Sequence, residues 1–218
     1  MKKIWNQSRE PMNCMTHLVG VFLFAIATLI MLLRAHEVGA SLQTTVSVVV
    51  FGISLMALYA ASALYHYYPG DHPHTLLWLR KLDHSMIYVL IVGTYTPISL
   101  YYLPAGENLL FTGILWVIAL VGIIVKLCWM GAPRFLSTLV YLLLGWSVLF
   151  DFNSFLSIPT SGLWLIAAGG IAYSIGAVIY IIKKPNLSNY FGFHEIFHLF
   201  ILLGSFLHVL AVYFYVLV

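Results

Sequence analysis

The sequence contains very little charge. Asp, Glu, Lys and Arg together make up 8% of the 218 residues, whereas a soluble domain usually carries about a quarter. Hydrophobic residues make up 62%, and the formal net charge is only +3. The few basic residues lie between apolar runs rather than in one patch, so a nucleic-acid partner is not expected. This composition argues against a water-soluble fold and indicates an integral membrane protein.

Cysteine is equally scarce. Cys14 and Cys128 are the two in the sequence, and the topology derived below places both near the cytoplasmic face, where thiols stay reduced. A structural disulfide is therefore not expected. Polar linkers, low-complexity stretches and internal repeats are also lacking. We expect a single membrane domain over residues 1–218, with a short cytoplasmic N-terminal segment, 1–15.

Long apolar runs are what the sequence does contain. Seven intervals are free of Asp, Glu, Lys and Arg, and each is close to or above the length that a helix needs to cross a hydrocarbon layer of ~30 Å. Between the two shortest runs, the segment 131–134 (Gly-Ala-Pro-Arg) is typical of a turn at a membrane surface, which favours two spans over one re-entrant hairpin. We therefore predict an all-α fold with seven transmembrane helices, in the runs 11–33, 38–70, 84–106, 108–125, 135–150, 152–182 and 196–218.

The distribution of Lys and Arg predicts the orientation of these helices. Basic residues are enriched in the cytoplasmic loops of membrane proteins. With the N-terminus in the cytoplasm, only Arg34 of the ten falls outside. The C-terminus is then outside, and the inside segments hold the other nine, which are Lys2, Lys3, Arg9, Arg80, Lys81, Lys126, Arg134, Lys183 and Lys184.

Several chemically active side chains fall on the cytoplasmic side of this topology. His17 is near the start of the first helix, His66 near the end of the second, Asp83 at the start of the third, and His194 and His198 at the start of the seventh. Helix starts and ends alternate between the two faces of the membrane. Avoidance of charge in the spans would therefore not by itself produce such a one-sided grouping, and we expect a shared site.

The spacing of His194 and His198 predicts a metal site. Residues four apart on a helix project from the same face, about one turn apart, and two such imidazoles can share a zinc ion. His66 is the natural third ligand, which leaves a fourth position for a water. The alternative for any single histidine is a side chain that hydrogen-bonds or snorkels at the interface. The segment also matches the His-Glu-x-x-His pattern of zinc proteases, with Glu195 as base, but no other protease motif accompanies it.

A set of short motifs resembles the hemolysin III family, the bacterial branch of the progestin and adipoQ receptor superfamily. The resemblance covers nearly the whole chain, from Glu10 to the end of the last helix. The motifs that carry it are Glu10-Pro-Met-Asn13-x-x-x-His17, Ser62-Ala-Leu-Tyr-His66, Lys81-Leu-Asp83, Gly93-Thr-Tyr-Thr-Pro97 and His194-x-x-x-His198.

The resemblance implies a seven-helix protein of the bacterial inner (plasma) membrane, with Zn²⁺ near the cytoplasmic face. His66, His194 and His198 would hold the zinc together with a water, Asp83 would hold or deprotonate that water, and Ser62 would line the site. Related membrane proteins hydrolyse the amide bonds of ceramides. The expected activity is thus a ceramidase-like, zinc-dependent hydrolysis of a lipid amide or ester. Membrane lipids would be the partners, and the role would lie in lipid or fluidity homeostasis.

Two other functions stay open at this point. If Asp83 is a fourth ligand, the zinc is structural, and the protein is a non-enzymatic sensor or receptor of the membrane state. The family name also carries a pore-forming haemolytic activity, but a pore needs a polar lining that these charge-poor spans hardly supply. Glu10, Asn13 and His17 are expected to form a polar cap at the start of the first helix. That cap would either stabilise the fold or support the metal ligands.

Overall fold

The computed structural model describes residues 7–188 and 191–218, and this part of the chain is all-helical. The all-α prediction is confirmed. Lys2 and Lys3 lie outside the described residues. The elements are α2 (Pro11–Glu37), α3 (Leu42–Tyr67), α4 (Pro73–Tyr102), α5 (Glu107–Cys128), α6 (Arg134–Gly145), the 3₁₀ segment η1 (Ser147–Ser157), α7 (Thr160–Ile182) and α8 (Phe193–Tyr215).

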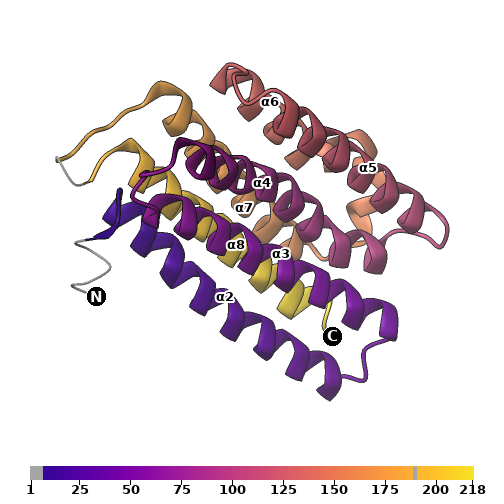
Figure 1. Ribbon diagram of the computed structural model, residues 1–218. Coiled ribbons are helices and arrows are strands. Elements are labelled where there is room, and N and C mark those ends of the chain that lie inside the picture. The colour runs from indigo at the N-terminus through magenta and orange to yellow at the C-terminus, as the bar shows by residue number, and fades with distance from the viewer. Residues whose placement is uncertain (1–6, 189–190) are drawn as a thin grey trace.

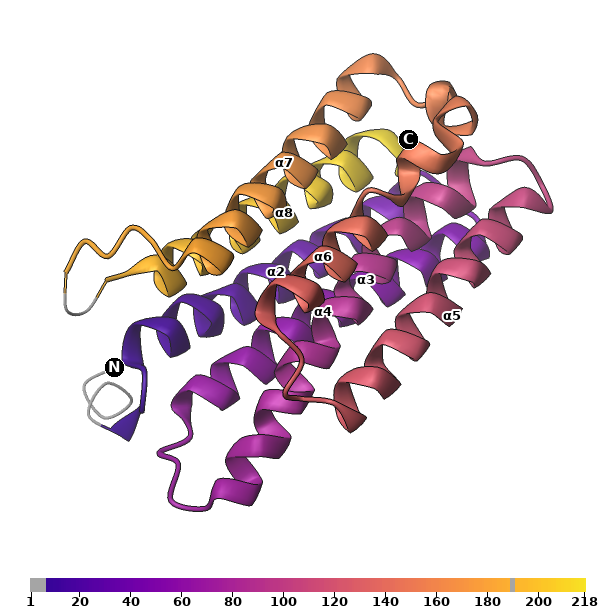
Figure 2. The same cartoon turned by 90° about the horizontal axis from the view of Figure 1, so that it is seen from above.

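The helices lie side by side in one elongated bundle (Figures 1 and 2). Each of α2, α3 and α4 packs against the next helix in the chain, and α7 packs against α8. The last helix also packs against α2 and α4, which brings the two ends of the sequence together. The histidines near the starts of α2 and α8 and at the end of α3 therefore meet at one end of the bundle.

Six segments are long and apolar enough to cross a membrane: α2, α3, α5, the combined stretch Arg134–Ser157, α7 and α8. The long helix α4 does not meet this criterion of length and apolar composition. It carries Arg80, Lys81 and Asp83 in its first half and buries several Ser and Thr side chains in its second. These hydroxyls bond to carbonyls of their own helix, as Thr94 does to the Leu90 oxygen at 2.8 Å. Since α4 packs against α3, α5, α6 and α8, it need not present an apolar surface all round.

Three boundaries differ from the sequence prediction. Asp83 is not at the start of its helix, because α4 begins at Pro73 and Asp83 lies ten residues further along. A charge-free run marks only the part of a helix that suits hydrocarbon, whereas backbone hydrogen bonds continue the helix beyond it. The expected runs 135–150 and 152–182 are also not continuous helices: α6 ends at Gly145, and η1, which contains Asp151, separates it from α7.

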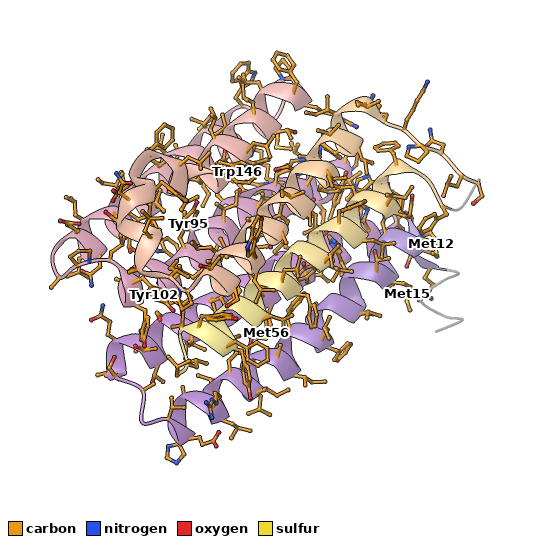
Figure 3. All side chains as sticks on the ribbon, turned by 180° about the vertical axis from the view of Figure 1, so that it is seen from behind. Met12, Met15, Met56, Tyr95, Tyr102 and Trp146 are labelled. Atoms are coloured by element: carbon orange, nitrogen blue, oxygen red, sulfur yellow. The ribbon has the colours of Figure 1, made fainter. Side chains whose placement is uncertain are left out.

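Hydrogen bonds from neighbouring helices stabilise the break after α6. The hydroxyl of Tyr95 donates to the Gly145 carbonyl at 2.7 Å and accepts from the Val148 N–H at 3.0 Å. The indole N–H of Trp146 donates to Ser174 Oγ at 3.0 Å. Figure 3 shows Tyr95 and Trp146 in this region of the bundle. Backbone groups freed by the end of the α-helix thus find partners away from water.

Close packing of α7 on α8 fixes the helix that carries two of the histidines. A Cβ atom at Gly169 would lie 2.4 Å from Cε1 of His208, and one at Gly204 would lie 2.5 Å from Cδ1 of Tyr173. Small residues let transmembrane helices approach in this way. Nδ1–H of His208 also donates to the Gly204 carbonyl, 2.7 Å away. This buried histidine therefore has a hydrogen-bond partner in its own helix.

Basic residues are divided between the two ends of the bundle. Arg34 donates to the carbonyl of Leu217 at 3.2 Å, so it lies at the end that holds the C-terminus. Arg9 lies at the other end, where Glu10 links it to His66. Which end faces the cytoplasm stays a prediction from the Lys and Arg distribution.

Candidate metal centre

Three histidines from two helices form a cluster at the end of the bundle opposite the C-terminus. One nitrogen of each of His66, His194 and His198 lies within 4.8 Å of the other two. The imidazole rings stand nearly perpendicular in two of the three pairs, at centroid distances of 5.0 Å and 4.8 Å. His66 and His198 are buried, and His194 is half-buried. The ring nitrogens thus converge on one point, and the rings do not stack face to face.

Glu10 fixes the orientation of His66. Its Oε2 lies 2.5 Å from Nδ1 of that ring, and its backbone N–H donates to the His66 carbonyl at 3.1 Å. Glu10 directly precedes α2, yet its side chain caps no helical N–H and turns to the histidine instead. An ionised carboxylate only accepts, so Nδ1 carries the proton and Nε2 keeps its lone pair. That Nε2 is buried and has no partner among the described protein groups.

The carboxylate of Glu10 is ionised at neutral pH. Burial raises its pKa, but the hydrogen bond from His66 and the charge of Arg9 lower the pKa more, to about 2. Arg9 Nε lies 3.2 Å from Oε1, and Asn13 Nδ2 lies 3.4 Å from Oε2. Glu10 and Asn13 therefore form one hydrogen-bonded group against the back of His66.

Thr16 fixes His198 in the same manner. Its hydroxyl donates to the Asn13 carbonyl at 2.9 Å, so it acts as acceptor for Nδ1 of His198, 3.1 Å away. Nδ1–H of His198 then points to Thr16, which leaves the lone pair of Nε2 free to bind a metal. The sequence analysis missed Thr16, because a hydroxyl inside a helix usually bonds to its own backbone. Its place three residues after Asn13, on the same helix face, was the available signal.

His17 lies against the cluster but does not join it. Its ring stacks on His198 at a centroid distance of 3.5 Å and an interplanar angle of 12°. Tyr59 packs edge-on against its side, at 4.9 Å. Neither ring nitrogen of His17 has a partner among the described protein groups. The structure therefore places His17 as a polar wall of the site.

Asp83 and Ser62 lie at a cavity of about 380 Å³. Both side chains line this cavity together with His194 and His198. The carboxylate of Asp83 does not belong to the group of mutually close ligand atoms that the described residues form. Its Oδ2 lies 3.6 Å from Nδ1 of the neighbouring His84.

A second cavity of about 370 Å³ continues the first along the bundle. Its walls are mainly apolar, with Phe152, Phe155, Leu163 and Trp164 among them. The two cavities share six wall residues, which are Thr94, Tyr95, Gly145, Trp146, Gly170 and His208. The path from the histidines therefore changes from polar to apolar along the bundle axis.

Glu195 has a structural role that excludes it from the metal site. Its Oε2 accepts from the backbone N–H of Gly192 at 2.8 Å, in a capping box at the start of α8. A carboxylate held in this way stabilises the first turn of the helix. The His-Glu-x-x-His pattern therefore does not supply a protease-like base here.

The donor set fits a zinc ion. Three imidazole nitrogens converge, and one of them, Nε2 of His66, is buried without a hydrogen-bond partner among the described protein groups. This donor set matches the ligand type and number of a zinc site with one open position. Around a tetrahedral zinc, donor nitrogens lie about 3.3 Å apart, so small ring movements would close the present cluster on the ion.

Comparisons with known proteins agree with this architecture. The haemolysin-III related family model matches residues 5–209. The chain is 36% identical over 211 residues to hemolysin-3 of Bacillus cereus, covering 95% of this chain and 92% of that one. It is 37% identical over 207 residues to the hemolysin-3 homolog of Bacillus subtilis, covering 94% and 93%.

The chain belongs to the haemolysin-III related family. The predicted family is thus confirmed, and with it a multi-pass membrane protein. A more distant match is the human monocyte to macrophage differentiation factor, 24% identical over 212 residues, with 93% of this chain and 82% of that one covered. This match supports the predicted relation of the haemolysin-III family to the progestin and adipoQ receptor superfamily.

Proposed function

We propose that this haemolysin-III protein is a zinc-dependent hydrolase that cleaves an amide or ester bond of a membrane lipid, and that it acts in lipid or fluidity homeostasis. One observation carries the proposal. Two of the three clustered histidines, His194 and His198, line a cavity that continues into an apolar one. A ligand with a polar linkage and a long apolar chain suits such a path.

His66, His194 and His198 would hold the zinc. Zinc with three protein ligands acts as a Lewis acid that lowers the pKa of a water to about 7 and polarises a carbonyl. Glu10 and Thr16 would keep two of the imidazoles in the required tautomer. Rigid support of this kind is typical of metal sites in which ligand orientation controls affinity.

Asp83 would act as the general base. It lines the same cavity as two of the histidines but stands outside the ligand group. From there, its carboxylate can accept the proton of an attacking water and return it to the leaving amine or alcohol. Ser62, on the same wall one helical turn before His66, would donate a hydrogen bond to the substrate. Among the described residues, no fourth side chain joins this ligand group, which favours this catalytic role over a closed structural site.

The apolar cavity tells against the pore-forming alternative. A conducting path would need polar groups along its length, whereas the second cavity is lined mainly by aromatic and aliphatic side chains. The same walls suit an acyl chain. Its terminal part would lie near Phe152 and Trp164, at the end of the path farthest from the histidines.

In the membrane, we place α4 as the third of seven spans, with Arg134–Ser157 as the fifth. The N-terminus would lie in the cytoplasm and the C-terminus outside, in a bacterial inner membrane. The histidine cluster would then face the cytoplasm. Support comes from the division of the basic residues between the two ends of the bundle.

The experiment is fatty-acid release from a panel of N-acyl and O-acyl lipids by the purified full-length protein in lipid nanodiscs. We expect release that a chelator abolishes and that zinc restores. His194→Ala should be inactive, and His36→Ala, an exposed histidine at the other end of α2, should match the wild type. Chelator-resistant release, or zinc-loaded wild type with no release from any N-acyl or O-acyl lipid in the panel, would count against the proposal.

A further inference from the structure

Lys126 is a buried cation without a counter-ion. Lys126 lies near the end of α5 and is 6% exposed. The ammonium donates to Ser137 Oγ at 2.8 Å, and no carboxylate of the described residues lies within ion-pair distance. A buried charge is costly unless it is paired, and an ionisable residue inside a membrane protein generally marks a functional site. The buried ammonium of Lys126 therefore needs a ligand that balances its charge.

The ammonium lies on the wall of the cavity that His194 and His198 line, since Lys126 and Ser137 both line it. Two further cations line the same cavity, Arg80 and Arg134, against one carboxylate, that of Asp83. The guanidinium of Arg134 lies over the ring of Tyr180, 5.0 Å from its centroid. Three positive charges and one negative leave a net charge of +2 at this polar end of the cavity.

A role in setting topology does not explain the burial. Basic residues that orient a membrane protein lie in loops or snorkel to the interface, as Lys183 and Lys184 do in the exposed loop after α7. Lys126 instead turns its ammonium to a serine of the next helix and to the cavity. Such a position suits an anion that enters the cavity.

We propose that Lys126 and Arg80 bind the phosphate of a membrane phospholipid, with Arg134 at the outer edge. A guanidinium can hold two phosphate oxygens, and an ammonium adds a point charge. With the phosphate at these cations, the glycerol backbone and its acyl linkages enter the cavity that the histidines line. Phospholipids would thus be the substrate class.

The reading of this phosphate site as a substrate subsite rests on the proposed hydrolase, but binding of the lipid can be measured without turnover. The probes are dioctyl-ether phosphatidic acid and dioctyl-ether glycerol, which share their chains, differ in the phosphate and have no bond to hydrolyse. Affinity for the full-length protein in detergent is measured by thermophoresis. We expect the wild type to bind the phosphate-bearing lipid at least about tenfold more tightly, as a charge-assisted contact predicts.

Lys126→Met keeps the length of the side chain and removes the charge, and it should reduce this preference to about twofold or less. If Lys126→Met fails to fold, Arg80→Gln is the second variant. We expect it to reduce the preference for the phosphate-bearing lipid as well. Lys184→Met, at an exposed lysine, is the matched control and should keep it.

Equal wild-type affinity for the two lipids would overturn the proposal, as would an undiminished preference in Lys126→Met. Sodium phosphate that competes at the concentration of the lipid would show that free phosphate, rather than a headgroup, is the ligand, and would overturn the lipid assignment. Because both probes resist hydrolysis, an inactive protein that still prefers the phosphate lipid would count against the hydrolase alone.

Discussion

Glu10 accepts a hydrogen bond from Nδ1 of His66 at 2.5 Å, across the gap between the residue that precedes α2 and the last turn of α3. The contact joins two segments 56 residues apart. It also decides which nitrogen of His66 is free for the metal. The start of α2 is therefore part of the candidate site and not merely a lead into the first helix.

Glu10→Gln should weaken zinc binding by about ten- to a hundredfold, the usual cost of losing a carboxylate that orients a histidine ligand. Glutamine can still accept a hydrogen bond, so the fold should persist. Competition with a chromogenic chelator measures the affinity. Glu37→Gln is the control, because Glu37 pairs with Arg34 at the opposite end of α2. An unchanged zinc affinity in Glu10→Gln would show that the His66 contact does not support the metal.

The purified wild type should contain about one zinc per chain, and His194→Ala or His198→Ala should remove most of it. Each substitution leaves only two imidazoles, which hold zinc weakly. Elemental analysis of detergent-purified protein provides the measurement, with His36→Ala as the matched control. If both histidine variants kept the wild-type metal content, the metal site would have to be elsewhere.

Spacing and topology were enough to predict which histidines would meet. The four-residue interval between His194 and His198 follows from helix geometry alone. His66 is on another helix, and it could be placed beside them because the seven predicted spans would alternate in direction and put its end of α3 on the same face. The packing of α8 against α2 then follows from side-chain fit, such as the close approach of Leu202 to Gly20, which no sequence pattern predicts.

Other features could not be predicted from charge and hydropathy. Nothing in the sequence separates Lys126 from an ordinary loop lysine, because its burial depends on where the fold places α6, whose Ser137 accepts a hydrogen bond from its ammonium. The end of α6 at Gly145 depends likewise on the hydroxyl of Tyr95, 50 residues away. Asp83 was placed at a helix start because a charge was taken to end the span, whereas α4 extends a further ten residues toward Pro73.

Reporter fusions test the proposed orientation. A fusion after Gly70, in the loop before α4, and one after Asn186, in the loop after α7, should report the cytoplasm, since Arg80 and Lys81 follow the first loop and Lys183 and Lys184 lie in the second. A fusion after Ala105, between α4 and α5, should report the outside if α4 spans the membrane. Cytoplasmic signals at all three sites would show that α4 does not cross, and an outside signal at Gly70 or Asn186 would reverse the assigned orientation.

Asp83→Asn separates a catalytic site from a structural one. Asparagine keeps the shape of the side chain but cannot take a proton, so a general base would be lost while the histidines stay in place. Since the carboxylate stands outside the ligand group of the described residues, we expect full zinc content, an unchanged melting temperature and a loss of fatty-acid release of at least about a hundredfold. A direct ligand would behave differently, because its loss would lower both zinc affinity and thermal stability. All three quantities are measured on one preparation, with Asp71→Asn, in the exposed loop before α4, as the control. Full zinc together with full activity would rule out both roles and leave Asp83 as a charge at the polar end of the cavity.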